Sequence, residues 1–394
     1  MRIAFCANGE SPHAQRWANG LAARGHEVAF IWAADQLESA DLSAFSASIS
    51  HHAHVTRAEL GRPWMLPTVM RAARRLAARL RPDVAHGLDL YGPAWTAQML
   101  GVRPLVLSAL GSDVGRLRGH SGGTLRARAG EAYRRSRTRA AVAAADVVLA
   151  DSEALAAVVR ERVPGTGTRI IRFGVEPEPL HPSTAAARAS WRARLGIADH
   201  AFVLLSSRLV HPLYNIDTIV TALPEIRRRV PGSVLVLKDL PQLSDPEYRR
   251  RCFELVRELG LQDAVRSVDE LPRGELLELF AAADVYVSVP TTDGTAVSLF
   301  EAMAAGVPIV ASDADGLDPE IVRNDETAIV VPRRNPDALA AAVVVLALDG
   351  ERRRRIVEGG RETVRLHGDF DRELDRAVLI YEELLARAAV PSVG

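Results

Sequence analysis

The stretch Asp293-Gly-Thr-Ala-Val-Ser-Leu-Phe-Glu301 decides how this chain is interpreted, together with the residues 302–313 that follow it. An apolar run, 283–289, comes before it and ends at a proline. Residues 297–305 have the pattern of a helix, which the next glycine and proline end, and 307–311 form a second apolar run. The pattern predicts a strand–loop–helix–strand unit.

The predicted helix carries the chemistry of this unit. Its first backbone N–H groups have no partner within the helix and lie at the positive end of the helix dipole, which suits a phosphate. Asp293 precedes these amides and Glu301 lies inside the helix. At about 1.5 Å per helical residue, the two carboxylates are far enough apart to hold hydroxyls on either side of a diphosphate. The residues predicted to bind a nucleotide-sugar donor here are Gly294, Thr295, Ala296, Val297, Ser298, Leu299 and Glu301.

This segment resembles the E-x7-E motif of the retaining GT-B glycosyltransferases of family four, the group 1 glycosyltransferases. In that family the first acid contacts the transferred sugar and the second holds the ribose hydroxyls, so the resemblance assigns these roles to Asp293 and Glu301. This chain departs from the motif by its aspartate at the first position, as does one branch with the pattern D-G-T-x-V-S-L-x-E-A-M-A. The resemblance implies an α/β protein with two Rossmann-like doubly wound domains that face each other across a cleft. A solvated acid on an ordinary helix is the alternative.

Composition limits the class of protein. The 394 residues suggest two or three domains, and the 48% hydrophobic and 25% charged content is ordinary for a globular chain. The net charge is zero, but residues 1–180 carry 23 arginines against 16 acidic residues, which suggests a negatively charged partner for the first half. Cys6 and Cys252 propose neither a disulfide framework nor a metal site, and the first residues do not resemble a signal peptide. We expect a cytoplasmic protein with peripheral contact at the inner membrane face.

The opening residues predict strand, loop, helix and strand, the start of a doubly wound domain. The glycines do not follow G-x-G-x-x-G, so we expect no nicotinamide cofactor, and no cofactor besides the nucleotide sugar as substrate. The stretch 11–28 resembles the start of family four and implies that His13 and Arg16 face the cleft; a capped surface helix is the alternative. Gly9 would let the backbone approach the phosphates.

Two further residues are implied on the acceptor side. His86 lies in a predicted strand, 82–87, which resembles the family's P-D-x-x-H, and Asp113 follows the predicted strand 104–110. Many relatives carry a histidine just before the next glycine, where this chain has Leu110, and this departure puts a histidine-assisted step in doubt. The acceptor-side residues are therefore His13, Arg16, His86 and Asp113.

Residues 116–139 contain eight arginines. They either form a solvated helix and loop or contact an anionic acceptor, such as a lipid diphosphate, or an acidic membrane face. No aromatic residues alternate with them, so we expect no nucleic-acid partner. His51, His52 and His54 have no acid or cysteine at ligand spacing, so we predict a loop there and no metal site.

The second half repeats the alternation of strands and helices and predicts a parallel sheet covered on both faces. Arg208 follows the predicted strand 201–206. Relatives place an arginine and, six residues later, a lysine on the donor diphosphate. Arg208 fits the first position, and Tyr214 stands at the second. A tyrosine hydroxyl donates a hydrogen bond but brings no charge to the leaving diphosphate.

The expected domain boundaries follow from these elements. Residues 1–178 form the acceptor domain and 199–370 the nucleotide-sugar domain. Between them, the Pro-rich and then Ala/Arg-rich stretch from 176 to 198 is predicted to be the linker. The last helix, in 371–394, is expected to return to the first domain.

The resemblance implies a retaining, metal-independent glycosyltransferase for hexosyl or N-acetylhexosaminyl groups. The donor would be a UDP-sugar ahead of a GDP-sugar, and the acceptor a glycan, a lipid-linked molecule or a natural product. Arg208 and Asp293 are the predicted catalytic residues: Arg208 stabilises the leaving diphosphate and Asp293 orients the sugar. A nucleotide-sugar epimerase or phosphorylase on the same fold, and a non-catalytic nucleotide-sugar-binding protein, are the alternatives. The sequence identifies neither the acceptor nor the oligomeric state.

Overall fold

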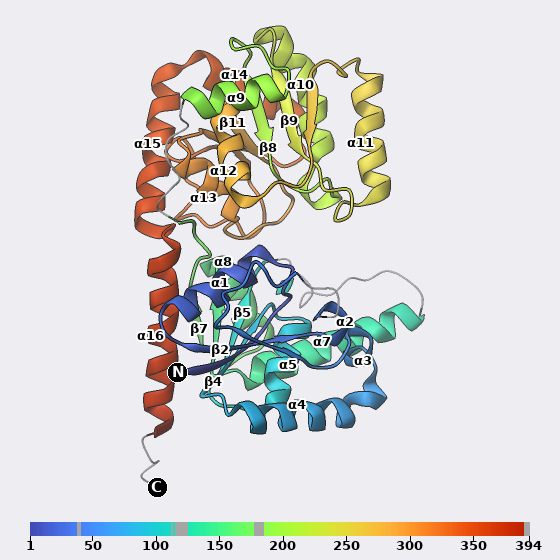
Figure 1. Ribbon diagram of the computed structural model, residues 1–394. Helices are drawn as coiled ribbons and strands as arrows, with labels where there is room; N and C mark the ends of the chain where they lie inside the picture. Colours follow the sequence, from blue (N-terminus) through green and yellow to red (C-terminus); the bar gives the residue numbers. More distant parts are fainter. Residues whose placement is uncertain (38–40, 112, 115–124, 177–184, 390–394) are drawn as a thin grey trace. The chain divides into compact units, whose positions relative to one another are not determined.

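The computed structural model describes the chain except residues 38–40, 112, 115–124, 177–184 and 390–394. The chain divides into two compact units, each built on a parallel sheet (Figure 1). Unit 1 comprises Met1–Phe173 with Asp371–Gly394, and unit 2 comprises Gly174–Phe370. The prediction of two doubly wound α/β domains is confirmed.

Unit 1 contains a seven-stranded sheet in the order β3-β2-β1-β4-β5-β6-β7. Its strands are β1 (Arg2–Cys6), β2 (Glu27–Trp32), β3 (Ser50–Ala53), β4 (Val84–Leu88), β5 (Leu105–Ala109), β6 (Val147–Ala150) and β7 (Thr168–Ile170). Its helices are α1 (Pro12–Ala23), α2 (Ala34–Leu37), α3 (Arg57–Leu60), η1 (Pro63–Met65), α4 (Leu66–Leu80), α5 (Gly92–Leu100), α7 (Leu125–Ala144), α8 (Glu153–Arg162) and α16 (Phe370–Ala389). The strand order reverses between β1 and β4, and ligands of doubly wound folds bind outside the carboxyl ends of strands at such a point.

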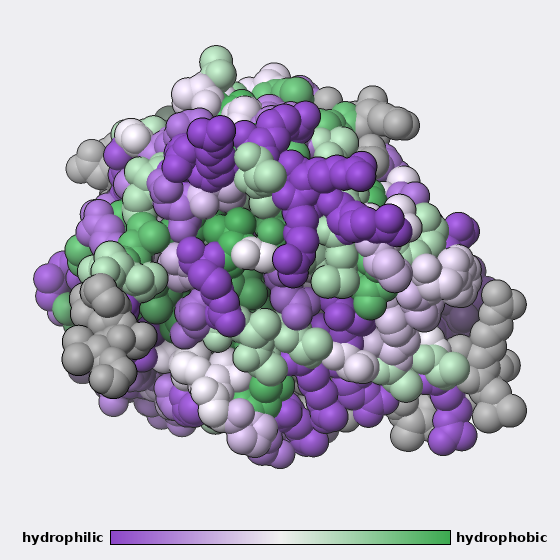
Figure 2. Space-filling model, turned by 90° about the horizontal axis from the view of Figure 1, so that it is seen from below, coloured by the Kyte–Doolittle hydropathy of each residue, from purple (hydrophilic) through white to green (hydrophobic). Residues whose placement is uncertain are grey.

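The sequence explains why these strands are central. β4 and β5 are buried at every residue, as expected for parallel strands covered on both faces. Helix α4 is amphipathic instead: Val69, Ala73 and Leu76 are buried, while four arginines on its other side are exposed, namely Arg71, Arg74, Arg75 and Arg79. Figure 2 views the molecule from the side on which α4 lies in Figure 1, and hydrophilic side chains are interspersed there with hydrophobic ones.

Unit 2 contains a six-stranded sheet in the order β10-β9-β8-β11-β12-β13. Its strands are β8 (Val203–Ser206), β9 (Val234–Lys238), β10 (Val265–Val268), β11 (Val285–Ser288), β12 (Ile309–Ser312) and β13 (Ile329–Val331). Its helices are α9 (Ala185–Arg194), η2 (Pro212–Tyr214), α10 (Ile216–Arg229), α11 (Pro246–Glu258), α12 (Arg273–Ala282), α13 (Val297–Ala304), α14 (Pro336–Leu348) and α15 (Gly350–His367). One hydrophobic cluster includes residues of α9, α12 and α13, and another includes residues of α10, α11 and α14. The strand order reverses between β8 and β11.

Helix α9 occupies part of the stretch that was predicted to be a linker, so that prediction is wrong for residues 185–194. Trp191 is buried, and the Arg192 side chain is only 1% exposed. The Arg192 guanidinium pairs with Asp284 at 2.7 Å and donates to backbone carbonyls, including that of Ala282. A helix rich in Ala and Arg resembles a linker in composition. Here Arg192 can be buried because each nitrogen of its guanidinium has a hydrogen-bond acceptor.

The two connections between the units run side by side within unit 2. The Val175 amide donates to the Gly368 carbonyl at 2.7 Å, and the Phe370 amide donates to the Val175 carbonyl at 3.0 Å. Gly174 has a φ of +42°, and a Cβ there would lie 2.5 Å from the Gly368 oxygen. Only glycine fits such a position.

Strand β3 corrects the loop that was predicted for the histidine cluster. His51 and His52 lie in this edge strand, and the Trp32 indole N–H donates to His51 Nδ1 at 3.0 Å. The His51 ring also lies against that of Phe45, with ring centroids 4.8 Å apart. An edge strand tolerates polar residues because one of its sides has no neighbouring strand. The sequence of β3 therefore lacks the alternation of apolar residues that would have predicted a strand.

Candidate donor-binding site

Helix α13 opens at the carboxyl edge of the unit 2 sheet, directly after β11. Its N-cap residue is Ala296, whose side chain makes no capping hydrogen bond. Helix N-caps are usually Ser, Thr, Asp or Asn, whose side chains satisfy the first amides. The Leu299 amide already donates to the Ala296 carbonyl at 3.0 Å, so a phosphate would be met by the amides of Val297 and Ser298.

The two residues predicted to be catalytic contact each other directly. Arg208 Nη2 lies 2.9 Å from Asp293 Oδ2, and both side chains are largely buried. Burial raises the pKa of Asp293, while Arg208 and the Gly294 amide oppose that rise. Burial also opposes the charge of Arg208, but Asp293 and two nearby tyrosines outweigh it and raise the pKa of the guanidinium. The site therefore holds a fixed cation beside a carboxylate.

Two further groups hold the Arg208 guanidinium in place. Its Nη1 donates to Ser298 Oγ, in the first turn of α13, at 3.2 Å. Its Cζ lies 4.2 Å from the centre of the Tyr214 ring, in a cation–π contact. Arg208, Tyr214 and Ser298 come from three separate segments, so the structure gathers residues that the sequence analysis placed in one site by resemblance.

The loop that carries Asp293 is fixed by residues which the sequence analysis did not select. The Asp293 amide donates to the Asp315 carbonyl at 3.0 Å. Gly316 has a φ of +91°, and a Cβ there would lie 2.4 Å from the backbone carbonyl oxygen of Asp293. Thr295 is buried and donates to Asp318 Oδ2 at 3.2 Å. A glycine directly after an apolar strand and its polar end was the available signal for this close approach.

Glu301 is buried one turn inside α13, and the chain's only lysine is within its electrostatic reach. Lys238 ends β9 and is half-buried. Burial lowers the pKa of the Lys238 ammonium, and the carboxylates of Glu301 and Glu270 partly offset that shift. Lys238 was not predicted to belong to the site. A single lysine in a chain that otherwise uses arginine was a signal, because the two cations differ in geometry.

Two family models match the chain. "Glycosyltransferase Family 4" matches residues 7–179, and "Glycosyl transferases group 1" matches residues 187–363, so together they span most of the sequence. The chain belongs to glycosyltransferase family 4.

The names of two relatives of this family 4 member refer to inositol-containing molecules. A GDP-mannose-dependent alpha-(1-6)-phosphatidylinositol monomannoside mannosyltransferase of Mycobacterium tuberculosis is 34% identical over 215 residues, 53% of this chain and 54% of the relative. A D-inositol 3-phosphate glycosyltransferase of Saccharomonospora viridis is 31% identical over 223 residues, 55% of this chain and 50% of the relative. The chain thus spans about half the length of these relatives.

Solved structures show the same fold over the whole chain. A sucrose-phosphate synthase of Thermosynechococcus elongatus has a TM-score of 0.81 at 22% identity and covers 98% of this chain and 100% of its own. Anabaena HepE in complex with UDP-glucose has a TM-score of 0.76 at 17% identity, with the same coverage of both chains. These similarities support the GT-B fold of the family 4 member.

The predicted acceptor-side residues of this family 4 member do not form one exposed group. His86 has no exposed surface: Nε2 lies 2.8 Å from Ser108 Oγ and Nδ1 lies 2.7 Å from the Tyr381 hydroxyl. Burial lowers the pKa of His86 to about 3. A side chain enclosed in this way does not contact an acceptor, so the acceptor-side assignment of His86 is corrected to a structural one.

Asp113 is also buried and organises two loops at the carboxyl edge of unit 1. Its carboxylate accepts hydrogen bonds from the amides of Leu90, Leu110 and Val114, each at 2.9 Å. Burial raises its pKa, and these amide donors oppose that rise. Asp113 therefore shapes the loops after β4 and β5, and its role on the acceptor side stays a prediction.

The remaining first-half predictions lie near the start of unit 1. His13 and Arg16 are half-buried on α1, and the His13 ring lies 5.4 Å from that of Phe173. A Cβ on Gly9 would lie 2.0 Å from the Trp32 ring, so packing alone accounts for that glycine. The role of Gly9 beside a phosphate stays a prediction.

The arginine-rich segment is partly described by α7. Within the described part of that helix, Arg134 pairs with Glu131 at 3.0 Å, and Arg137 donates to Gln98 at 2.9 Å. Arg128 is exposed and Arg135 half-buried. Arg116, Arg118 and the side chain of Arg126 lie outside the described residues. Two of the arginines are thus engaged within unit 1.

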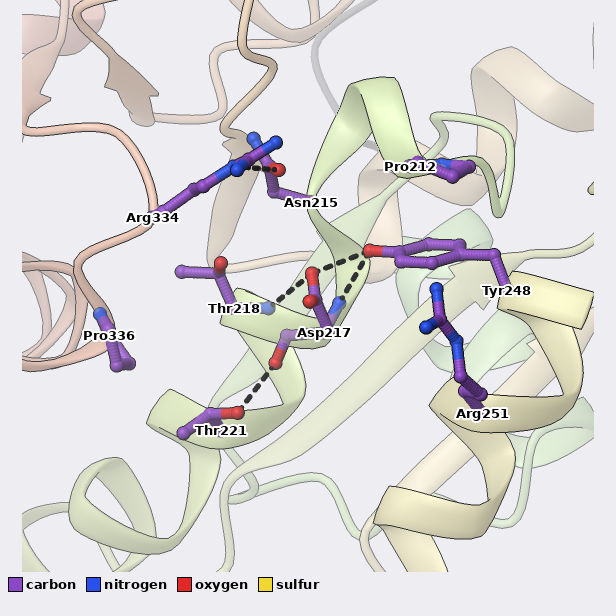
Figure 3. A pocket seen from close by; sticks show the side chains of 9 residues that line it. All are labelled: Pro212, Asn215, Asp217, Thr218, Thr221, Tyr248, Arg251, Arg334 and Pro336. Carbon is purple, nitrogen blue, oxygen red and sulfur yellow. Dashed lines mark hydrogen bonds between the residues drawn. The ribbon is translucent and has the colours of Figure 1, made fainter. Parts of the chain in front are cut away.

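A pocket of about 380 Å³ adjoins the candidate site (Figure 3). It lies where α10, α11 and α14 begin, and the Tyr248 hydroxyl there donates to Asp217 Oδ1 at 2.5 Å. Asn215, in a left-handed conformation with a φ of +48°, accepts from Arg334 Nε at 3.2 Å. Pro212 and Asn215, on either side of Tyr214 in the sequence, line the pocket. None of the residues predicted to bind the donor lines it.

Proposed function

We propose that this chain is a retaining glycosyltransferase that transfers a hexosyl group from a nucleoside-diphosphate sugar. The observation that carries the proposal is the contact of Arg208 with both Asp293 and Ser298, at the start of a helix without a side-chain cap. A fixed guanidinium and free helix amides together suit a diphosphate, and the neighbouring carboxylate suits a sugar hydroxyl. Unit 2 would thus bind the donor.

In this proposal the residues act mainly on the leaving diphosphate. As the bond between the sugar and the diphosphate breaks, negative charge grows on the phosphate oxygens. Arg208 and the amides of Val297 and Ser298 stabilise that charge, and they need little reorganisation because Arg208 is already held in place. Asp293 orients the sugar and Glu301 binds the ribose. The acceptor hydroxyl attacks from the face that the diphosphate leaves, which retains the anomeric configuration. We expect no metal requirement.

The relatives support a nucleotide-sugar donor. They differ in its nucleotide base, which therefore has to be identified by experiment. The Mycobacterium tuberculosis relative is GDP-mannose-dependent by name, and the HepE structure contains UDP-glucose. A panel of UDP-, GDP-, ADP- and TDP-sugars in a thermal-shift assay would identify the base. Release of the nucleoside diphosphate only when an acceptor is present would distinguish a transferase from an epimerase. Saturable donor binding without turnover with any acceptor would favour a non-catalytic protein.

A second proposal concerns the membrane. Trp64 is 75% exposed and lies in η1, directly before α4. Four arginines of the amphipathic helix α4 are also exposed. No helix among the described residues is long and apolar enough to cross a membrane. An exposed tryptophan next to a basic amphipathic helix is typical of contact with an anionic membrane surface. We propose that unit 1 binds such a surface peripherally through this patch, Trp64 and the α4 arginines.

A further inference from the structure

Asn215 lies directly after Tyr214 and joins the η2 turn to two other loops of unit 2. Its side chain is buried, with the residue only 3% exposed, although asparagines usually lie at the surface. A buried amide group needs acceptors for its N–H donors and a donor for its oxygen. For Asn215 these partners come from the loops that follow β11 and β13. From the sequence, no role was predicted for this residue.

The amide nitrogen of Asn215 contacts the loop after β11. Nδ2 donates to the Val289 carbonyl at 2.8 Å and to Thr291 Oγ1 at 3.1 Å. The backbone repeats this connection, because the Thr291 amide donates to the Leu213 carbonyl of the η2 turn at 2.8 Å. The η2 turn and the loop after β11 are therefore joined by both side-chain and backbone hydrogen bonds.

The amide oxygen of Asn215 has its partner in the loop after β13. It accepts from Arg334 Nε at 3.2 Å, and Figure 3 shows the Arg334 side chain extending toward Asn215. The preceding residue, Arg333, donates to the Thr291 carbonyl at 3.0 Å and pairs with Asp315 at 2.9 Å. Two consecutive arginines after β13 thus hold the η2 turn and the loop after β11 from the same side.

The backbone of Asn215 has a left-handed conformation, with a φ of +48° and a ψ of +47°. Asparagine adopts this conformation more readily than most residues that carry a side chain, and glycine adopts it more readily still. A turn that required only this conformation would be served best by glycine. Glycine would, however, leave the Val289 carbonyl and Arg334 without the amide group that they contact. Asn215 therefore serves both the backbone turn and the connection between the loops.

The two loops that Asn215 joins carry the two main partners of Arg208. Tyr214 precedes Asn215, and its ring centre lies 4.2 Å from the guanidinium carbon. Asp293 follows Thr291 by two residues, and its carboxylate pairs with Arg208 at 2.9 Å. A shift of one loop against the other would separate Arg208 from one of these partners. Misplacement of a catalytic group by about 1 Å can cost about 10²-fold in rate.

We propose that Asn215 is a positioning residue, which holds Tyr214 and the loop of Asp293 in place around Arg208 before the donor binds. It acts through these partners and not on the donor itself. The proposal rests on the donor site proposed above and adds the residue that keeps this site assembled.

The test uses Asn215→Gly, which keeps the left-handed conformation and removes only the amide group. Calorimetry with UDP or GDP, whichever the wild type binds more tightly, should show a dissociation constant raised about tenfold. Turnover at saturating donor should fall about tenfold or more. In an Arg208→Ala background, Asn215→Gly should change the dissociation constant by less than about twofold, because its partners then have no guanidinium to hold.

Thr291→Val provides a second variant that keeps the shape of the side chain and removes one acceptor of the Asn215 amide. It should weaken nucleotide binding less than Asn215→Gly does, and Arg208→Ala should abolish this effect as well. Asn324→Gly is the matched control. It removes a side-chain hydrogen bond with the Val330 amide, at the amino edge of the same sheet, and should lower the melting temperature without changing nucleotide binding or turnover.

Two results would overturn the proposal. One is a lower melting temperature of Asn215→Gly with wild-type nucleotide binding and turnover, which would make Asn215 a structural residue only. The other is the same fold-loss of affinity with and without Arg208, which would show that Asn215 does not act through the guanidinium. Failure of the donor proposal would show separately, as nucleotide binding that Arg208→Ala alone leaves unchanged.

Discussion

The guanidinium carbon Cζ of Arg208 lies over the ring of Tyr214, 4.2 Å from the ring centre. Where relatives are expected to carry a lysine, this chain therefore has an aromatic ring that holds the neighbouring cation in position. From the sequence, only the hydroxyl group of Tyr214 was predicted to contribute. The structure adds the ring, which can favour the charged form of Arg208 without supplying a charge of its own.

The ring and the hydroxyl of Tyr214 can be separated by substitution. Tyr214→Phe keeps the ring, so it should lose at most one neutral hydrogen bond, about 0.5–1.5 kcal/mol of donor binding. Tyr214→Leu removes the cation–π contact and should cost about 0.5–2 kcal/mol more. Calorimetric titration with the preferred nucleotide sugar would compare the two. Equal losses for both variants would show that the ring does not support Arg208.

Arg208 itself should matter for turnover more than any surface arginine. Arg208→Ala removes the side-chain cation at the proposed leaving group and should cut turnover by about 10²–10³, the scale of losing one strong electrostatic contact. Arg250→Ala is a suitable control, because Arg250 is an exposed residue of α11 with only a 3.7 Å pair to Glu254. Steady-state kinetics would compare the turnover of the two variants with that of the wild type. Near-normal turnover in Arg208→Ala would place the diphosphate elsewhere.

Glu301 and Lys238 should act together on the donor. Glu301→Gln weakens the proposed hydrogen bonds to the ribose and should cost about 1–3 kcal/mol of donor binding. Lys238→Met should cost less, and the double variant should lose less than the sum of the single losses, because the two charges interact. A double-mutant cycle measured by calorimetry with UDP and GDP would test this. Strictly additive losses would mean that Lys238 acts independently of Glu301.

Much of the candidate donor site could be predicted because its residues are local in sequence. Gly294 to Glu301 lie on one loop and one helix, and the apolar runs on both sides defined the strands. Arg208 was assigned through the resemblance, and its position after a predicted strand agrees with this, since carboxyl ends of parallel strands meet at one edge. Lys238 and Gly316 were missed because their importance depends on contacts between separate strands, which no local pattern records.

The acceptor side shows the opposite case. His86 and Asp113 were assigned to the acceptor side through the resemblance to family four, at the ends of two predicted strands. In the structure, His86 meets Tyr381 of the last helix and Asp113 meets three backbone amides. Polar residues at strand ends can equally bind the rest of the protein, and only the tertiary partners distinguish the two roles.

Membrane contact through Trp64 can be tested by vesicle sedimentation. The wild type should bind vesicles that contain phosphatidylglycerol and should bind less at higher salt, because screening weakens the attraction of exposed charges. Trp64→Ser, or Arg74→Gln with Arg75→Gln, should reduce the bound fraction. The adjacent exposed pair Arg228→Gln with Arg229→Gln on α10 is the control and should not. Equal binding to neutral and anionic vesicles, or none to either, would contradict the proposed patch.

The burial of His86 should make unit 1 sensitive to acid. Burial lowers the pKa of His86 from 6.5 to about 3 in the folded protein, whereas the unfolded chain keeps the ordinary value. Between these two values the unfolded state binds one more proton than the folded state. The free energy of unfolding therefore falls as the pH decreases from about 6.5 to about 3, by up to about 1.4 kcal/mol per pH unit from this residue.

Urea unfolding followed by tryptophan emission would measure this effect, because four of the five tryptophans, Trp17, Trp32, Trp64 and Trp95, belong to unit 1. Between pH 7.5 and 5.5, His86 should account for about 1 kcal/mol of the lost stability. His86→Gln should be less stable at pH 7.5, since it loses ring packing against Trp17, yet its stability should fall less with acid. His200→Gln, at an exposed position in unit 2, should retain the wild-type pH dependence. If His86→Gln shows the same pH dependence as the wild type, His86 is not the buried neutral group that the structure describes.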